Sequence, residues 1–111
     1  GLLDSALKLI PKSNTIKIIR VPGVFEIPVT ISKNIKKYDG FLALGCIIKG
    51  QTPHFDFISQ ASTSAIMELS IINKKPIGNG IITCLNMRQA KTRKKKGTEA
   101  AKAVISVLSQ K

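Results

Sequence analysis

The stretch that decides the fold is residues 41–48, which read Phe-Leu-Ala-Leu-Gly-Cys-Ile-Ile. Turn signals precede it at Tyr38-Asp39-Gly40, and a polar loop follows it. An apolar run of this length without polar alternation is typical of a strand that is buried on both faces. Such strands belong to parallel sheets covered by helices on both sides, so the stretch indicates the α/β class.

The flanking segments alternate between helix and strand patterns. Two further strands are predicted at 15–21 (TIKIIRV) and 76–83 (PIGNGIIT), both β-branched and bounded by turn residues. Helices are predicted at 2–10, from Pro28 to the turn at Tyr38, and at 53–73, 89–93 and 97–110. With 111 residues and neither linker nor repeat, the chain is expected to be one domain over 1–111.

Composition narrows the class of protein. Hydrophobic residues make up 43% of the chain and charged residues 22%, which is a globular balance rather than a disordered one. No apolar run approaches the ~18 residues that cross a bilayer, so no membrane association is expected. The two cysteines, Cys46 and Cys84, are too few for a disulfide scaffold, and we interpret them as reduced thiols of a cytoplasmic protein.

The chain is strongly basic, with 18 Lys and Arg against 6 Asp and Glu, for a net charge of +12. This balance indicates anionic partners. Most of the basic residues are Lys, however, and aromatic residues are only 5% of the chain. Specific base recognition favours Arg, and single strands need stacking platforms, so specific nucleic-acid binding is not expected. A basic RNA-binding module stays open as an alternative.

His54 is the only histidine and follows the apolar stretch at its carboxyl end. Ligands of open α/β sheets bind at that edge. Thr52 can cap the next helix and Pro53 can begin it, which would put His54 in the first turn. An imidazole there can transfer protons near neutral pH. The alternative is a polar residue that merely starts a helix.

Other residues near the predicted strand ends are candidates for ligand binding. Gln51 and Thr52 lie at a helix start that suits an anion, and Arg93 can hold a phosphate through two hydrogen bonds. Glu26 follows the strand predicted at 15–21 and can bind hydroxyl groups. A capped loop, a solvated basic run and a helix-starting carboxylate are the respective alternatives. No metal site is expected, because one histidine and no clustered carboxylates are present.

Four ordered blocks carry a resemblance to a known family. They are VPGVFEIP (21–28), GCIIKGQTPHFDF (45–57), PIGNGIITCLNMRQAKTR (76–93) and KGTEAA (96–101), and they resemble the lumazine synthases of riboflavin biosynthesis. The resemblance implies a flavodoxin-like three-layer αβα sandwich and a transferase. Its reaction condenses 5-amino-6-(D-ribitylamino)uracil with 3,4-dihydroxy-2-butanone 4-phosphate, releases phosphate and yields 6,7-dimethyl-8-ribityllumazine. No cofactor and no metal are implied.

The resemblance also assigns roles to individual residues. His54 matches the proton-transfer histidine of the family, Arg93 its phosphate-binding arginine, and Gln51 with Thr52 its phosphate loop. Lys96 matches a lysine for which a phosphate role is open. The segments that contact the uracil and its ribityl chain match Val24, Phe25, Glu26, Cys46, Ile47 and Ile48.

Two departures from the family pattern stand out. Asn79 occupies a position that is Phe in many members, where a neighbouring subunit covers the substrate, so we expect altered packing there. The first strand of the family, which lies inside the sheet and supplies an aromatic residue, has no counterpart in this sequence. The chain is therefore expected to be an N-terminally incomplete version of a longer one.

The resemblance implies a homo-oligomer with active sites between subunits. The connection from Arg93 to Gly97 contains only three lysines, which favours pentamers over the shells of some members. Riboflavin synthase is a candidate partner. A catalytically degenerate relative that only binds flavin-like ligands is the remaining alternative.

Overall fold

Two parallel strands form the centre of the fold in the computed structural model, which describes residues 1–49 and 54–110. Strand β1 is Phe41–Ile48 and strand β2 is Ile77–Cys84. They pair in step over their whole length, from Phe41 opposite Ile77 to Ile48 opposite Cys84. The strand predicted at 41–48 is confirmed, and the one predicted at 76–83 is confirmed with a shift of one residue.

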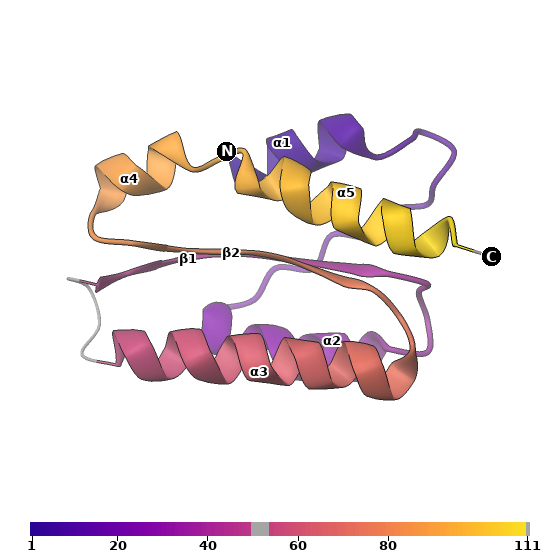
Figure 1. Cartoon of the computed structure of the whole chain (residues 1–111), viewed down its shortest axis with the longest axis horizontal. Helices are drawn as coiled ribbons and strands as arrows, with labels where there is room; N and C mark the ends of the chain where they lie inside the picture. Colours follow the sequence, from indigo (N-terminus) through magenta and orange to yellow (C-terminus); the bar gives the residue numbers. More distant parts are fainter. Residues whose placement is uncertain (50–53, 111) are drawn as a thin grey trace.

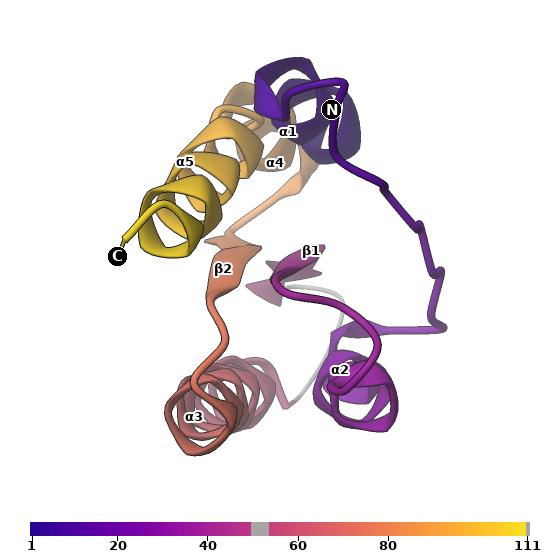
Figure 2. The same cartoon turned by 90° about the vertical axis from the view of Figure 1, so that its right-hand side faces the viewer.

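Helices cover both faces of this sheet (Figures 1 and 2). One layer contains α1 (Leu2–Leu9), α4 (Met87–Thr92) and α5 (Lys96–Leu108). The other contains α2 (Ile27–Asn34), the short 3-10 helix η1 (Val24–Glu26) that precedes it, and α3 (Phe55–Asn73). The predicted three-layer α/β sandwich of the flavodoxin-like kind is confirmed. Helix α2 ends before the predicted turn at Tyr38, and among the described residues no helix is long and apolar enough to cross a membrane.

Small residues let α5 lie directly on the sheet. A Cβ added to Gly78 would clash with the carbonyl oxygen of Ala100, and one added to Gly80 would lie 2.5 Å from Cδ2 of Leu44. Opposite these glycines, Ala100 and Ala101 of α5 are buried. On the other face, the core consists of Ile27, Ile31, Ala43 and Ile66.

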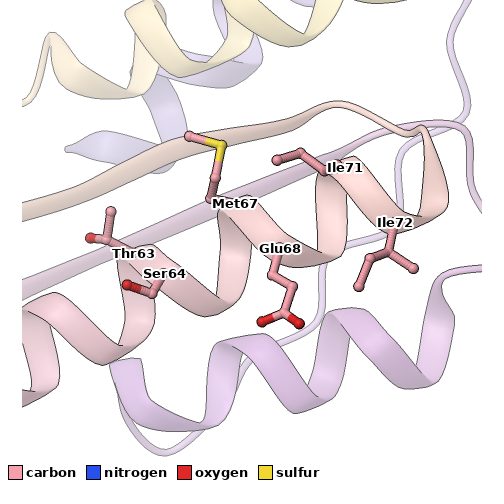
Figure 3. A pocket seen from close by; sticks show the side chains of 6 residues that line it. All are labelled: Thr63, Ser64, Met67, Glu68, Ile71 and Ile72. Atoms are coloured by element: carbon pink, nitrogen blue, oxygen red, sulfur yellow. The ribbon is translucent and has the colours of Figure 1, made fainter.

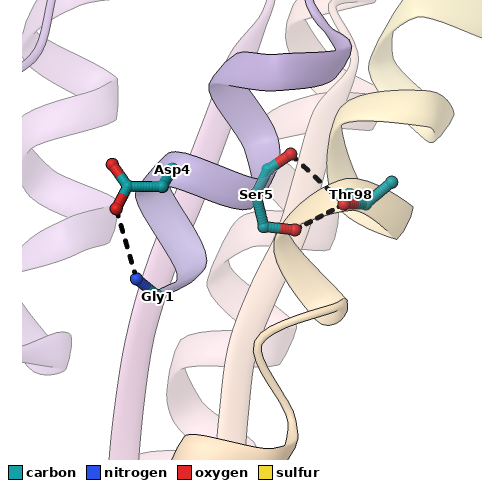
Figure 4. A network of polar contacts seen from close by, with 4 residues as sticks. All are labelled: Gly1, Asp4, Ser5 and Thr98. Atoms are coloured by element: carbon teal, nitrogen blue, oxygen red, sulfur yellow. Dashed lines mark hydrogen bonds and ion pairs between the residues drawn. The ribbon is translucent and has the colours of Figure 1, made fainter.

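Helices α1 and α5 are held together by a close contact between their backbones and by a hydrogen bond between two hydroxyl groups. A Cβ at Gly97 would clash with the carbonyl oxygen of Leu2, so only glycine allows this distance. The hydroxyl groups of Ser5 and Thr98 share a hydrogen bond, and Thr98 Oγ1 also donates to the carbonyl of Ser5 at 3.2 Å (Figure 4). The start of α5, and with it the connection from Arg93, is thereby fixed.

The prediction of a strand at 15–21 is wrong. The segment carries no strand assignment, and β1 pairs only with β2 in the described sheet. Its isoleucines Ile16, Ile18 and Ile19 are 45–47% exposed. β-branched residues favour an extended backbone, but a strand also needs a hydrogen-bonded neighbour. The local pattern is therefore not sufficient to predict a strand at 15–21, because the segment has no hydrogen-bonded neighbour in the described sheet.

Candidate active site

The carboxyl ends of both strands lie at one edge of the sheet. Because β1 and β2 are parallel and in register, Ile48 and Cys84 end opposite each other. The starts of α3 and α4 lie at this same end of the molecule (Figure 1). In open α/β sheets this edge is where ligands bind. Most of the predicted site residues belong to segments that meet here.

Helix η1 carries Val24, Phe25 and Glu26 to the region between β1 and α3. Val24 packs on Gly45 of β1, where an added Cβ would lie 2.9 Å from the Val24 Cγ2. The Phe25 ring stacks on Phe57 of α3, with ring centroids 6.3 Å apart and planes inclined by 26°. Both rings stay largely exposed, Phe25 at 56% and Phe57 at 63%. They therefore form a flat apolar surface rather than part of the core.

Glu26 lies between η1 and α2 and is half-buried. It occupies the N-cap position of α2, but its side chain makes no capping hydrogen bond. A Cβ at Gly23 would be 3.4 Å from Glu26 Oε1, so the carboxylate lies close to the Gly23 backbone. Glu26 thus lies at a helix N-terminus, as the alternative of a helix-starting carboxylate requires, although its side chain does not cap the helix.

The end of β1 carries Cys46, Ile47 and Ile48. The Ile47 side chain is buried, Ile48 is half-buried, and Cys46 is exposed. Partial desolvation raises the pKa of the Cys46 thiol, and the neighbouring Cys84 thiol raises it further. Cys46 is accordingly a protonated thiol near neutral pH rather than a nucleophilic thiolate.

His54 occupies the N-cap position of α3 and is exposed. Its carbonyl accepts a hydrogen bond from the backbone N–H of Ile58 at 2.8 Å, which fixes it to the first turn. The prediction placed His54 inside that turn, whereas the helix begins one residue later, at Phe55. Gln51 and Thr52, predicted to bind phosphate, lie outside the described residues, as does the predicted helix start at Pro53.

Arg93 ends α4 at the same edge of the sheet. Its Nη1 donates a hydrogen bond of 2.6 Å to the carbonyl of Thr83, the residue opposite Ile47. The guanidinium is thus held at the end of β2 and stays exposed. An anchored, exposed guanidinium is suited to binding a phosphate.

Sequence reasoning missed the residues that position α4. Asn86 Oδ1 accepts a hydrogen bond of 3.0 Å from the N–H of Gln89, and Gln89 Oε1 accepts one of 2.8 Å from the N–H of Leu85. This reciprocal arrangement resembles a capping box, whose signal is a capping residue followed three positions later by Glu or Gln. The Asn-x-x-Gln spacing at 86–89 carried that signal.

Two further predicted site residues, Asn79 and Lys96, make their contacts within their own segments. Asn79 lies opposite Ala43 in the middle of β2, and its Oδ1 accepts a hydrogen bond of 3.0 Å from the N–H of Ile81. It precedes Thr83 by four residues, or about 13 Å along a strand. The backbone N–H of Lys96 donates to the carbonyl of Arg93 at 3.1 Å, while its ammonium lies 3.5 Å from Glu99 Oε2.

A hollow of about 460 Å³ lies elsewhere, on the outer face of α3 (Figure 3). It is lined by Thr63, Ser64, Met67, Glu68, Ile71 and Ile72. These residues come from the middle and the end of α3, far along the helix from His54. The hollow is therefore separate from the edge at which the candidate catalytic groups gather.

The chain is similar in sequence to one family of known proteins. Residues 1–111 match the family described as 6,7-dimethyl-8-ribityllumazine synthase. Proteins of that name from Cutibacterium acnes and Bartonella henselae are each 42% identical to the chain, over 118 and 121 residues. These matches cover 98% and 100% of the chain and 71% and 78% of the relatives. A third, from Renibacterium salmoninarum, is 44% identical over 92 residues, covering 81% of the chain and 58% of the relative.

Proposed function

The chain belongs to the 6,7-dimethyl-8-ribityllumazine synthase family, and on this premise we propose that it catalyses lumazine formation. The amine of 5-amino-6-(D-ribitylamino)uracil condenses with the ketone of 3,4-dihydroxy-2-butanone 4-phosphate. The products are 6,7-dimethyl-8-ribityllumazine, inorganic phosphate and two molecules of water. This transferase reaction belongs to riboflavin biosynthesis, and the free thiols of the chain suit a cytoplasmic enzyme.

The observation that carries the proposal is the common location of His54 and Arg93. His54 is the N-cap residue of α3, which starts at the carboxyl end of the sheet (Figure 1), and Arg93 is hydrogen-bonded to the penultimate residue of β2 at that end. A proton carrier and a phosphate-binding group are what imine formation followed by phosphate elimination requires. Their fixed positions supply the orientation on which such a condensation depends.

Each proposed step has a residue of this chain assigned to it. The guanidinium of Arg93 binds the phosphate, with Gln51, Thr52 and Lys96 as further phosphate contacts. His54 accepts and returns protons while the amine adds to the ketone, water leaves, and phosphate is eliminated. The uracil ring and ribityl chain contact Val24, Phe25, Glu26 and the end of β1 at Cys46, Ile47 and Ile48.

We propose further that a second copy of the chain completes the site, within a pentamer. Phe25 and Phe57 expose a stacked apolar surface beside the carboxyl edge, which one chain leaves uncovered. Apolar surface of this kind is characteristic of interaction sites. Asn79, which lies away from the edge within its own chain, would then contribute to the site of the neighbour.

The test is to mix both substrates with the purified chain and measure lumazine fluorescence and released phosphate. The wild-type chain is expected to form the two products in equal amounts. His54→Ala is expected to slow turnover about 10²-fold, the lower end of what a positioned acid–base group contributes. Lys12→Ala, an exposed residue outside the site, is the control and should retain full activity.

Two results would contradict this assignment. If the wild-type chain binds a ribityl-pyrimidine ligand but releases no phosphate, the chain is a binding protein and not a condensing enzyme. If His54→Ala and Lys12→Ala turn over at equal rates, His54 is not the proton carrier. The RNA-binding alternative gains no support from the family match.

A further inference from the structure

Both cysteines of the chain lie on one face of the sheet, close to its carboxyl edge. Cys46 is opposite Ile82 in the register, and Cys84 is opposite Ile48, so the two are diagonal neighbours on adjacent strands. Cys84 shares its face with Gly78 and Gly80, since alternate residues of a strand point the same way. Gly78 approaches Ala100 of α5 and Gly80 approaches Leu44 of β1, which places both thiols on the side of the sheet that α4 and α5 cover.

The diagonal register makes a direct disulfide unfavourable. Adjacent strands are about 4.8 Å apart, and two residues span about 6.6 Å along a strand, so the two Cα atoms are separated by roughly 8 Å. Disulfides need Cα atoms less than about 7 Å apart, because the S–S bond is only about 2.05 Å long. The two thiols lie near each other, since burial and the Cys84 thiol both raise the pKa of Cys46, but ideal strand spacing places their Cα atoms beyond the range usual for a disulfide.

A soft metal ion bridges a longer gap than an S–S bond does. With a metal–sulfur distance of about 2.3 Å, as in zinc thiolates, a linear S–metal–S unit separates the two sulfurs by up to ~4.6 Å. Thiolates select soft ions, Cu(I) among them. The described residues contain no group of three or more His, Cys, Asp or Glu side chains that could hold a metal, so this pair offers two ligands rather than four.

Exposure and charge around the pair also suit a cation. Cys46 is exposed and can meet an ion from solvent, whereas Cys84 is only 2% exposed and can shield a bound one. A Cu(I) ion between two thiolates leaves one net negative charge. Arg93, hydrogen-bonded to the carbonyl of Thr83, the residue that precedes Cys84, carries a positive charge opposite in sign to that of the complex.

We propose that Cys46 and Cys84 together form a two-coordinate site for a soft monovalent cation, specifically Cu(I). Binding forms two copper–sulfur bonds and releases two thiol protons to solvent. Copper stays in the monovalent state, so no oxidant or reductant takes part. The site shares Cys46 with the surface proposed to contact the uracil, so copper binding is tested by titration of the chain without substrates and not by turnover.

The test is anaerobic titration of the reduced chain with Cu(I) against a competing Cu(I) chelator such as bathocuproine disulfonate. One Cu(I) per chain is expected to bind, with two sulfur neighbours in its X-ray absorption spectrum. Cys84→Ser and Cys46→Ser should each weaken binding at least 100-fold. Met67→Leu, which removes an exposed sulfur on α3, is the matched control and should bind like the wild type.

Several outcomes would overturn the proposal. The first is that the wild-type chain binds no Cu(I), and the second is that Cys84→Ser still binds it. The third is a ratio of one Cu(I) per two chains, which would indicate that the ion bridges two copies. Circular dichroism of each variant shows whether it is folded, and Cys84→Ala replaces Cys84→Ser if the buried hydroxyl prevents folding.

A mild thiol oxidant such as diamide supplies a second test. A mass loss of two hydrogens within one chain would show that the sulfurs meet directly and would contradict the argument from register.

Discussion

At the scale of single residues, the contact between Arg93 and Thr83 explains how an exposed arginine can serve the proposed phosphate site. One guanidinium N–H is used to fix the side chain to the end of β2. Arginine has five such donors in a rigid fork, so anchoring by one leaves others for a ligand. Lysine carries the same charge but has no such fork, and it cannot be anchored and bind a phosphate in the same geometry.

We therefore expect Arg93→Lys to raise the KM for the butanone phosphate about 10- to 100-fold, with a smaller change in kcat. The expected size corresponds to one charge-assisted hydrogen bond of about 1.5–3 kcal/mol. Steady-state kinetics with the ribitylaminouracil held at saturation measure it. Lys94→Ala is the control, since it removes an exposed neighbouring charge with no assigned role. An equal rise in KM for both variants would mean that the phosphate is bound by the total positive charge of residues 93–96 and not by Arg93 specifically.

At the scale of elements, the contact between β2 and α5 depends on the absence of side chains. Gly78 lies beneath the carbonyl of Ala100, and a methyl group there would also lie 2.7 Å from Cδ2 of Leu42. The obstacle on one side is helix backbone, which cannot rotate away as a flexible side chain would. The whole helix must move to admit the methyl group, and the burial of Ala100 and Ala101 is lost with it.

Gly78→Ala is expected to lower the free energy of unfolding by about 1–3 kcal/mol, the usual effect of overpacking a core. Urea denaturation followed by circular dichroism measures it. Gly23→Ala is the matched control, because the nearest atom to its added Cβ is Glu26 Oε1 at an ordinary 3.4 Å. If both variants unfold at the same urea concentration, α5 does not rest on β2 as closely as the structure indicates.

At the scale of the whole molecule, the chain leaves a large part of its apolar surface uncovered. Met67, Ile71 and Ile72 form an apolar strip on the outer face of α3, around the hollow of about 460 Å³, with Ile71 67% exposed (Figure 3). A monomer rarely exposes apolar side chains in such a group. The strip therefore supports the proposed assembly of several copies.

Ile71→Lys is expected to shift the chain from the assembly to its monomer of 12.0 kDa. A lysine cannot bury its charge in an apolar interface without a partner. Sedimentation velocity measures the mass of the wild-type and variant chains. Val107→Lys makes the same change at an exposed position of α5 in the opposite layer, and its mass should equal that of the wild type. An unchanged mass for Ile71→Lys would remove this strip from the interface.

Local sequence patterns predict a helix or strand correctly where its conformation depends mainly on the residues of that segment. The run at 41–48 predicted β1 because eight successive apolar residues between turn signals are typical of a buried strand, although only Ala43 and Ile47 of this strand are buried in the structure. The helical spacing after His54 likewise identified α3, whose end at Asn73 agrees with the prediction. His54 and Arg93 could be selected for their chemistry and for the ordered blocks in which they occur.

Only the tertiary structure shows which segments that are distant along the chain contact each other. The sequence alone determined the α/β class, the family and the candidate residues, since residue type and spacing are properties of each segment. The failure of 15–21 to pair, the anchoring of Arg93 on Thr83 and the diagonal placement of Cys46 and Cys84 depend on which backbones lie side by side. Hydrogen-bonded pairing is non-local, so no pattern within one segment specifies its neighbour.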